Sequence, residues 1–377
     1  MAQPLRLPRR ILMTADAVGG VWSYALDLAT ELGKQDVATV LAVMGPISAQ
    51  HREQAAAIPS LTLEAASFKL EWMAGAQADL EGAGAWLLNL ARIHQADLVH
   101  LNSYAPALLP WEAPTVLVAH SCLATWWRSV HGSAPGPEWS AYLDRVRDAL
   151  AVADMVVAPS RAMLNDLAVV YGKSNLANTR AIHNGRDLGR FPASPAKEPF
   201  VLCAGRLWDL GKGIGALNKA AAGLDWPVYA AGPLSGPDDG LEIEFPGLIH
   251  LGSLPATDLA EWMRHAAVFC SPSLYEPFGL AVLEAAMSGA ALVLSDIPTF
   301  RELWDGAAVF VPPADTECLR HTLRQLIGQQ DRIAELGRAA RVRSFEYTLA
   351  RSVRGYAELY SELLARDTQP VLAHAAG

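Results

Sequence analysis

Cysteine is scarce in this chain of 377 residues, and the few cysteines lie far apart. The sequence therefore has neither the closely spaced pairs of a zinc knuckle nor those of a thioredoxin-like redox site. We expect reduced thiols at all four positions, which are Cys122, Cys203, Cys270 and Cys318.

An excess of positive charge and a long hydrophobic run are also missing. Charged residues make up 18% of the chain and the formal net charge at pH 7 is -9, whereas binding to a nucleic-acid backbone requires a basic surface. The apolar run that follows residues 1–10 has the length of a strand, which is too short for a signal peptide or a membrane span. We expect a cytoplasmic protein without a nucleic-acid partner, and a local patch could still attach it to the inner face of a membrane.

What the sequence does have is a large apolar fraction, 51% of its residues, arranged in two series of alternating patterns. In each series, short runs of Val, Ile and Leu alternate with longer helical patterns. This alternation is typical of βαβ units and of parallel sheets buried on both faces. Because the length of the chain also favours two domains, we expect an α/β protein with two Rossmann-like domains.

A stretch rich in Gly and Pro, residues 184–199, separates the two series. The first series has strand candidates at 11–14, 37–43, 98–101, 115–119, 155–159 and 179–183, and the second at 200–203, 228–231, 249–251, 268–271, 291–294 and 308–311. An apolar stripe predicts a long helix over 344–365. We place an N-terminal domain at 1–190, a C-terminal domain at 198–345, and a C-terminal helix at 346–366 that packs back on the first domain.

A pair of glycines follows the first predicted strand, where a helix begins. Asp16, Gly19 and Gly20 lie at this turn. Glycine lets a ligand approach the backbone closely, and the N-terminus of a helix attracts phosphate or carboxylate. A tight connection without a ligand is the alternative explanation. The turn does not match the dinucleotide fingerprint GxGxxG, which disfavours an NAD-dependent oxidoreductase.

Two cations flank a glycine-containing turn after the first strand of the second series. Arg206 can bind phosphate oxygens with two nitrogens, and Lys212 can add a point charge. Together they suit a diphosphate leaving group, whose negative charge grows as it departs. A solvated surface loop is the alternative explanation for this pair taken alone.

The most informative motif contains two glutamates eight positions apart. The pattern predicts a strand, a loop and a helix in that order, with Glu276 in the loop and Glu284 more than one turn into the helix. A carboxylate in a crevice can bind two adjacent hydroxyls, so the pair could hold a sugar and a ribose. The backbone at Phe278, Gly279 and Leu280 would then face phosphate. A loop cap and an ion pair with a nearby arginine are the alternative explanations.

Polar and aromatic side chains are expected at the carboxyl end of the first sheet, where open α/β sheets bind ligands. His120 directly follows the predicted strand at 115–119. A hydrogen bond within the core explains many histidines in such positions equally well. Asp16, Asn102, Tyr104 and Trp126 are further candidates, and packing is the alternative explanation for the aromatic ones.

Together, these motifs resemble glycosyltransferase family 4, whose members are retaining enzymes with the GT-B fold of two Rossmann-like domains facing each other across a cleft. The resemblance covers nearly the whole chain. It rests on an ordered set of motifs: Gly19-Gly20, His120, the turn His183-Asn184-Gly185, Arg206 with Lys212, and Glu276 with Glu284.

The resemblance implies a role for each motif. Arg206 and Lys212 would hold the diphosphate of a nucleotide-diphosphate-sugar donor, whose nucleotide could be UDP, GDP or ADP. Glu284 would bind the donor ribose, Glu276 and His120 would contact the transferred sugar, and the base would lie near Leu254. The donor site would comprise Gly19, Gly20, Arg206, Lys212, Leu254, Glu276, Phe278, Gly279, Leu280 and Glu284.

The expected activity is that of a retaining hexosyltransferase of polysaccharide or glycolipid biosynthesis. His120, Glu276, Arg206 and Lys212 are the expected catalytic residues. The acceptor would be a saccharide, a lipid-linked molecule or a small molecule, bound at Asp16, Asn102, Tyr104 and Trp126. We expect no cofactor and no metal, because the sequence has no Asp-x-Asp pair, which holds a cation in the other major transferase architecture.

Two positions depart from the pattern of the family. Six positions separate Arg206 from Lys212 where five is commoner, which leaves the reach of Lys212 open. Arg186 follows Asn184-Gly185 where a small aliphatic residue is usual, and we expect this change to affect only the linker.

Two other functions remain compatible with the sequence. A sugar-nucleotide epimerase on a similar scaffold would consume a donor without an acceptor. An inactive sugar-nucleotide-binding protein would bind a donor without turnover, although the presence of His120, Arg206, Lys212 and Glu276 argues against it.

Overall fold

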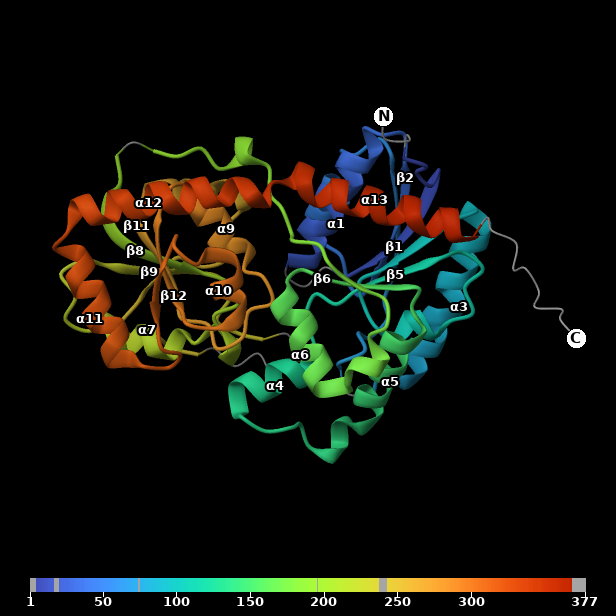
Figure 1. Cartoon of the computed structure of the whole chain (residues 1–377), viewed down its shortest axis with the longest axis horizontal. Helices are drawn as coiled ribbons and strands as arrows, with labels where there is room; N and C mark the ends of the chain where they lie inside the picture. Colours follow the sequence, from blue (N-terminus) through green and yellow to red (C-terminus); the bar gives the residue numbers. More distant parts are fainter. Residues whose placement is uncertain (1–4, 17–19, 74, 195, 237–242, 368–377) are drawn as a thin grey trace, which may run out of the picture.

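The computed structural model describes residues 5–16, 20–73, 75–194, 196–236 and 243–367, which form two α/β domains side by side (Figure 1). Each domain consists of one parallel sheet with helices on both faces. The predicted α/β class and the pair of Rossmann-like domains are therefore confirmed.

The N-terminal sheet has the strand order β3-β2-β1-β4-β5-β6-β7. Its strands are β1 (Arg10–Ala15), β2 (Ala38–Met44), β3 (Leu61–Ala66), β4 (Leu98–Leu101), β5 (Thr115–Val118), β6 (Met155–Ala158) and β7 (Thr179–Ala181). The helices of this domain are α1 (Gly20–Gly33), α2 (Ala49–Ala56), α3 (Gln77–His94), α4 (Leu123–His131), α5 (Ser140–Val152) and α6 (Arg161–Tyr171).

The C-terminal sheet has the strand order β10-β9-β8-β11-β12-β13. Its strands are β8 (Glu198–Ala204), β9 (Val228–Ala231), β10 (Ile249–His250), β11 (Ala266–Ser271), β12 (Ala291–Ser295) and β13 (Val309–Val311). The helices are α7 (Ile214–Ala221), α8 (Ala256–His265), α9 (Leu280–Met287), α10 (Pro298–Trp304), α11 (Thr316–Ile327) and α12 (Gln330–Ser344), followed by α13 (Leu349–Asp367).

The central strands read as apolar runs because they are covered on both faces. Successive side chains of a strand point to opposite sides, so β1 contributes Ile11 and Met13 to a core with α1 and α13, and Leu12 to a core with α3. The same division occurs in β8, where Leu202 packs with α9 and α10 while Val201 packs with α7 and α11. Apolar burial on both faces therefore holds each sheet in place.

The chain passes between the domains twice. It enters the C-terminal domain through residues 184–197 and returns after α12, where α13 crosses the top of the N-terminal domain (Figure 1). Tyr356 and Tyr360 of α13 are fully buried in the core that α1 and β1 share. The two chain crossings lie side by side, because Arg186 forms a parallel bridge with Thr348.

All strands predicted from the sequence are present, with ends that differ by one or two residues. Strand β3 was not predicted, because this edge strand is only half-buried and lacks a continuous apolar run. The predicted terminal helix starts as a short 3-10 turn, Phe345–Tyr347, and becomes α13 at Leu349.

Each sheet has one position at which the strand order reverses, so that the connections from two adjacent strands lead in opposite directions. This position lies between β1 and β4 in the N-terminal sheet and between β8 and β11 in the C-terminal sheet. Loops diverge at such switch points and leave a crevice at the carboxyl ends of the strands, which is where open α/β sheets bind ligands. The motifs found in the sequence follow these strands.

Candidate functional site

On the N-terminal side, three polar side chains meet where neighbouring strands end. Asp16, Asn102 and His120 follow β1, β4 and β5, which are adjacent in the sheet. The amide of Asn102 is fixed by Thr14, since its backbone N–H donates to Thr14 Oγ1 (2.9 Å) and its Nδ2 donates to the Thr14 carbonyl (2.7 Å). The remaining oxygen of this amide, Oδ1, lies 2.7 Å from Nε2 of His120.

This contact defines the state of His120. Because Asn102 Oδ1 can only accept, Nε2 of His120 carries the hydrogen and Nδ1 is left as an acceptor for a hydroxyl. Burial lowers the pKa of His120 to about 4, so the ring is neutral at physiological pH. The phenol ring of Tyr24 packs edge-on against the imidazole at a centroid distance of 4.6 Å and fixes its tilt.

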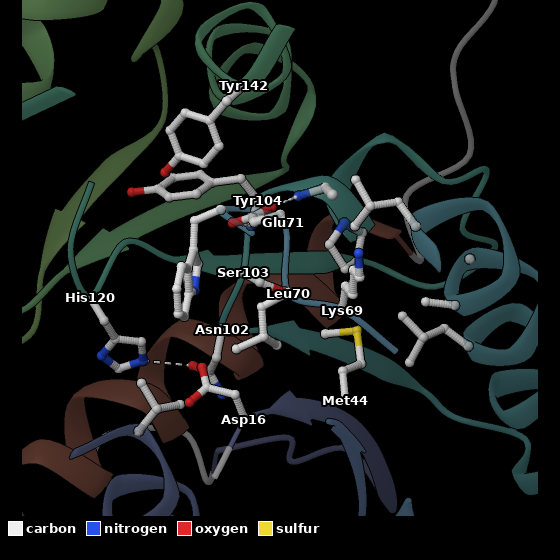
Figure 2. Close-up of a pocket in the computed structure, with 18 of the residues that line it drawn as sticks. Asp16, Met44, Lys69, Leu70, Glu71, Asn102, Ser103, Tyr104, His120 and Tyr142 are labelled. Atoms are coloured by element: carbon white, nitrogen blue, oxygen red, sulfur yellow. Dashed lines mark hydrogen bonds between the residues drawn. The ribbon is translucent and has the colours of Figure 1, made fainter. Parts of the chain in front are cut away.

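Asp16, Asn102 and His120 line a cavity of about 120 Å³ in the N-terminal domain (Figure 2). Asp16, Asn102 and His120 lie at one side of this cavity, and Glu71 and Tyr104 lie at another (Figure 2). Lys69 also lines the cavity (Figure 2), and the apolar and phenolic residues of its walls include Met44, Leu70, Trp72, Leu87, Leu109 and Tyr142. Hydroxyl-binding groups beside apolar walls suit a sugar-like molecule.

Two of the polar groups around this cavity are already engaged by the protein. Glu71 accepts from the backbone N–H groups of Tyr104 (3.0 Å) and Ala105 (2.6 Å), and burial raises its pKa. The phenol of Tyr104 donates to the carbonyl of Ser121 (2.8 Å). Within the described residues, the buried hydroxyl of Ser103 has no hydrogen-bond partner, which leaves it available to a ligand.

On the C-terminal side, Asp209 organises the turn that carries Arg206. Its carboxylate is 7% exposed and accepts from Arg206 Nη2 (2.8 Å) and from the backbone N–H of Gly211 (2.9 Å). Burial disfavours the charged form of Asp209. The positive charge of Arg206 outweighs this effect, so the pKa of Asp209 lies below its usual range. In the described part of the chain, the buried Nε of Arg206 has no hydrogen-bond partner, although the side chain as a whole is 42% exposed.

Lys212 reaches the first glutamate of the sequence motif. The segment that follows Arg206 ends in a short 3-10 turn, Leu210–Lys212. Nζ of Lys212 lies 2.5 Å from Oε2 of Glu276, and both side chains are largely buried. The turn then needs glycine at position 213, where φ is +65° and a Cβ would lie 2.1 Å from the Pro272 carbonyl.

The second glutamate motif surrounds the start of α9. Gly279 has a φ of +91° and ends the loop that holds Glu276, while Glu284 lies inside the helix as the spacing predicts. Phe278 is buried in the domain core, so only its backbone could contact a ligand. A Cβ placed on Gly20 would lie 3.3 Å from Leu280, which brings the first glycine motif against α9. Gly19 lies outside the described residues.

Glu284 is engaged by an arginine that the sequence analysis assigned only to the linker. Nε of Arg186 donates to Oε1 of Glu284 at 2.7 Å. The ion pair considered as an alternative for Glu284 is therefore present, and Arg186 lies beside the expected ribose site.

The loop with Leu254 joins β10 to α8 and lies beside the Arg206 turn. The backbone N–H of Gly232 donates to the carbonyl of Gly252 (2.9 Å), two residues before Leu254. A Cβ on Gly232 would lie 1.8 Å from the carbonyl of Gly205, so the three loops are stacked closely.

Trp126 does not line the cavity of the N-terminal domain. Its indole Nε1 instead donates to Oδ1 of Asp209 (2.9 Å), and this bond joins α4 to the Arg206 turn across the two domains. Such contacts cannot be predicted from local sequence patterns, because the two partners lie more than 80 positions apart in the chain.

Other polar contacts between the domains were not predicted either. The buried hydroxyl of Tyr275 accepts from the backbone N–H of Cys122 (3.1 Å) and lies 2.8 Å from Thr125 Oγ1. Glu302 of α10 accepts from the N–H groups of Arg161 (2.9 Å) and Ala162 (2.7 Å), the first residues of α6. These contacts hold α4 and α6 of the N-terminal domain against Tyr275, which precedes Glu276, and against α10 of the C-terminal domain.

Metal sites and membrane-spanning helices were also sought. The described residues contain no cluster of three or more His, Cys, Asp or Glu side chains able to hold a metal ion. Among the helices described, none combines the length and the apolar character needed to cross a membrane.

Models of two sequence families match the chain, one on each domain. The model described as Glycosyltransferase Family 4 matches residues 18–190, and the model described as Glycosyl transferases group 1 matches residues 198–329. Together they cover most of the chain, including every motif on which the resemblance was based.

Curated relatives agree with these matches. The chain is 28% identical to the alpha-maltose-1-phosphate synthase of Mycolicibacterium smegmatis over 77% of this chain and 85% of that protein. It is 32% identical to the GDP-mannose:cellobiosyl-diphosphopolyprenol alpha-mannosyltransferase of Xanthomonas oryzae over 57% of this chain and 60% of that protein.

Solved structures share the fold over almost the whole chain. The sucrose-phosphate synthase of Thermosynechococcus elongatus matches with a TM-score of 0.79 at 19% identity, over 95% of this chain and 99% of that one. HepE of Anabaena in complex with UDP-glucose matches with a TM-score of 0.75 at 18% identity, over 94% and 99%. The fold is GT-B, and the chain belongs to glycosyltransferase family 4.

Proposed function

We propose that this glycosyltransferase is a retaining, metal-independent enzyme that takes a hexose from a nucleotide-diphosphate donor on the C-terminal domain, residues 198–345. The acceptor is a saccharide or a lipid-linked sugar bound by the N-terminal domain, residues 1–190. The C-terminal helix at 346–366 packs on that domain. The cationic turn beside Glu276 carries the proposal, because it combines Arg206, whose Nε has no partner among the described residues, with a lysine 2.5 Å from a carboxylate.

The diphosphate is the substrate part that this turn fits. Arg206 offers a guanidinium fork and Lys212 an ammonium group, and the first amides of α9 at Gly279 and Leu280 add a helix N-terminus. Negative charge that develops on the leaving phosphate would strengthen each of these contacts. Stabilisation of this kind lowers the barrier without a metal ion.

The transferred sugar is proposed to lie between Glu276 and His120. Glu276 is held by Lys212, which disfavours its attack on the anomeric carbon as a nucleophile. Retention of configuration, which the family resemblance implies, then requires attack of the acceptor on the same face that the diphosphate leaves. Nδ1 of His120 can accept a hydrogen bond from a sugar hydroxyl, because Nε2 is committed to Asn102.

The acceptor is proposed to enter the cavity lined by Asp16, Asn102 and Tyr104. Its carboxylate, amide and hydroxyl groups beside apolar walls fit a sugar ring with an apolar face. The relatives support a role in glycan or glycolipid biosynthesis, since one is named as a mannosyltransferase that acts on a diphosphopolyprenol-linked sugar. We place the reaction in the cytoplasm, in keeping with four free cysteines, and at the inner face of the membrane for a lipid-linked acceptor.

The proposal is tested by transfer assays with UDP-, GDP- and ADP-sugars and a panel of saccharide and lipid-linked acceptors, with EDTA present throughout. We expect transfer from one donor in EDTA, with NMR of the product showing the anomeric configuration of the donor. An inverted product would contradict retention, and activity lost in EDTA but restored by a divalent cation would contradict metal independence. Donor conversion without an acceptor would indicate an epimerase instead.

A further inference from the structure

An arginine in the linker has its side chain buried between the two domains. Arg186 follows Asn184-Gly185, its N–H donates to the carbonyl of Tyr347 (3.3 Å), and its carbonyl accepts from Leu349 N (2.9 Å). It therefore lies where both chain crossings between the domains run side by side. Its side chain is only 8% exposed, which is unusual for a linker arginine.

The guanidinium of Arg186 joins two carboxylates that belong to different domains. Nε donates to Oε1 of Glu284 on α9, and Nη1 donates to Oδ2 of Asp27 on α1, both at 2.7 Å. The other oxygen of Asp27 accepts from Arg190 Nη1 at 3.1 Å. Asp27 is 15% exposed and Glu284 is 14% exposed, so water screens these contacts weakly.

The energetics of this cluster favour a fixed geometry. Burial disfavours the charged form of Arg186, but Glu284 and Asp27 outweigh this effect and raise its pKa, so the guanidinium remains charged. A guanidinium is planar and presents its donors in a rigid fork, and removing one partner from a buried charge cluster is costly. One oxygen of Glu284 is therefore held by Arg186, which in turn is anchored on Asp27.

This geometry bears on the ribose. With Oε1 occupied by Arg186, Glu284 presents Oε2 to a ligand, and within the described residues no side chain or backbone N–H donates to that oxygen. A carboxylate held in this way already has the orientation in which it meets the hydroxyls of a ribose. Binding of the ribose then costs little side-chain conformational entropy.

We propose that Arg186 is a positioning residue that holds Glu284 in the orientation that recognises the donor ribose and, through Asp27, links this orientation to the arrangement of the two domains. The proposal rests on the proposed function, which assigns the ribose to Glu284. This positioning role accounts for an arginine at position 186, where the family usually has a small aliphatic residue.

The test compares Arg186→Gln with Arg190→Gln as a matched control, because Arg190 also pairs with Asp27 but is 51% exposed and does not contact Glu284. The probes are UDP, GDP and ADP and then, for whichever nucleotide binds the unmodified protein, its 2′-deoxy form. Calorimetry gives the ratio of the two dissociation constants. Donor KM and kcat are measured in parallel with the corresponding sugar nucleotide.

We expect the unmodified protein to prefer the ribonucleotide about tenfold or more, because a missing hydroxyl leaves a buried polar group unpaired. Arg186→Gln and Glu284→Gln should both move the ratio toward one, with a raised donor KM and a nearly unchanged kcat. Arg190→Gln should keep the ratio. The double variant with both Gln changes should show the same ratio as Glu284→Gln alone, since both changes remove one interaction.

The outcomes separate the two proposals. If Glu284→Gln abolishes the preference and Arg186→Gln keeps it, the positioning role is refuted and the proposed function stands. If Glu284→Gln keeps the preference, or no nucleotide binds, the assignment of the ribose to Glu284 fails and the inference fails with it. Should Arg186→Gln not fold, Arg186→Lys decides, because an ammonium cannot replace the fork, and a ratio equal to that of the unmodified protein would refute the inference.

Discussion

The substitution Asp209→Asn tests whether the Arg206 turn is organised by one buried carboxylate. Asp209 accepts from Arg206, from the Gly211 N–H and from the indole of Trp126 on the other domain. An asparagine has nearly the same shape and keeps one oxygen, but its Nδ2 would face Arg206 with a donor. The turn would therefore lose its ion pair and would hold Gly211 and Trp126 through a neutral acceptor.

The size of the effect follows from exposure. Arg206 is 42% exposed, so water screens its pair with Asp209 and we assign to it less than about 1 kcal/mol. The N–H of Gly211 and the indole of Trp126 would donate to a neutral acceptor instead of a charged one, which lowers the stability by about a further 1 kcal/mol. The total destabilisation is then about 1–2 kcal/mol. Because Arg206 is no longer held, affinity for the nucleoside diphosphate should fall about tenfold, or about 1.4 kcal/mol.

Thermal unfolding and calorimetric titration with UDP, GDP and ADP measure both effects. The control is Trp126→Phe, which removes only the hydrogen bond from Trp126 to Asp209, one of several polar contacts between the domains, and should leave nucleotide affinity nearly unchanged. If Asp209→Asn bound the nucleotide as tightly as the unmodified protein while Arg206→Ala lost binding, Asp209 would have no part in placing Arg206. The account of this turn would then be refuted.

Three further predictions concern the fold and the N-terminal side of the site. Gly213→Ala should destabilise the protein by more than about 1 kcal/mol, because a Cβ would lie 2.1 Å from the Pro272 carbonyl, and an unchanged melting temperature would contradict the tight approach of this turn to Pro272. His100 lies in β4 and is completely buried. Burial lowers the pKa of His100 from 6.5 to about 3, so the unfolded chain takes up a proton that the folded protein does not. The free energy of unfolding should therefore fall as the pH drops from about 6.5 toward 3, and His100→Gln should reduce this slope by up to about 1.4 kcal/mol per pH unit; equal slopes would speak against a neutral buried ring. Asn102→Ala should lower transfer at least about tenfold, because it removes the acceptor that fixes the tautomer of His120, and transfer at the rate of the unmodified protein would contradict this role.

The sequence predicted the central strands of both sheets because they are covered on both faces. Val99 and Leu101 of β4 and Val116 and Leu117 of β5 are completely buried, and burial of this kind requires an apolar run that can be read directly. The edge strand β3 is half-buried and polar in part, so it has no such run and was missed. Prediction therefore succeeded where burial alone determines the residue type.

The site was predictable as a set of loops but not as a set of contacts. His120 and Glu276 could be placed because each follows a predicted strand, and the topology brings the carboxyl ends of neighbouring strands together. The partners of Arg186 lie 98 and 159 positions away, and nothing in the local sequence indicates them. Arg186 was therefore assigned to the linker alone, whereas its side chain joins both domains beside Glu284.

The most direct test of the account is calorimetric titration of the metal-free protein with UDP, GDP and ADP in EDTA, repeated on Arg206→Ala and Lys212→Ala. The account predicts that one nucleotide binds selectively without metal and that both substitutions weaken its binding about tenfold or more, because each removes a cation from the diphosphate. Binding of none of the three, or binding that neither substitution changes, would contradict it.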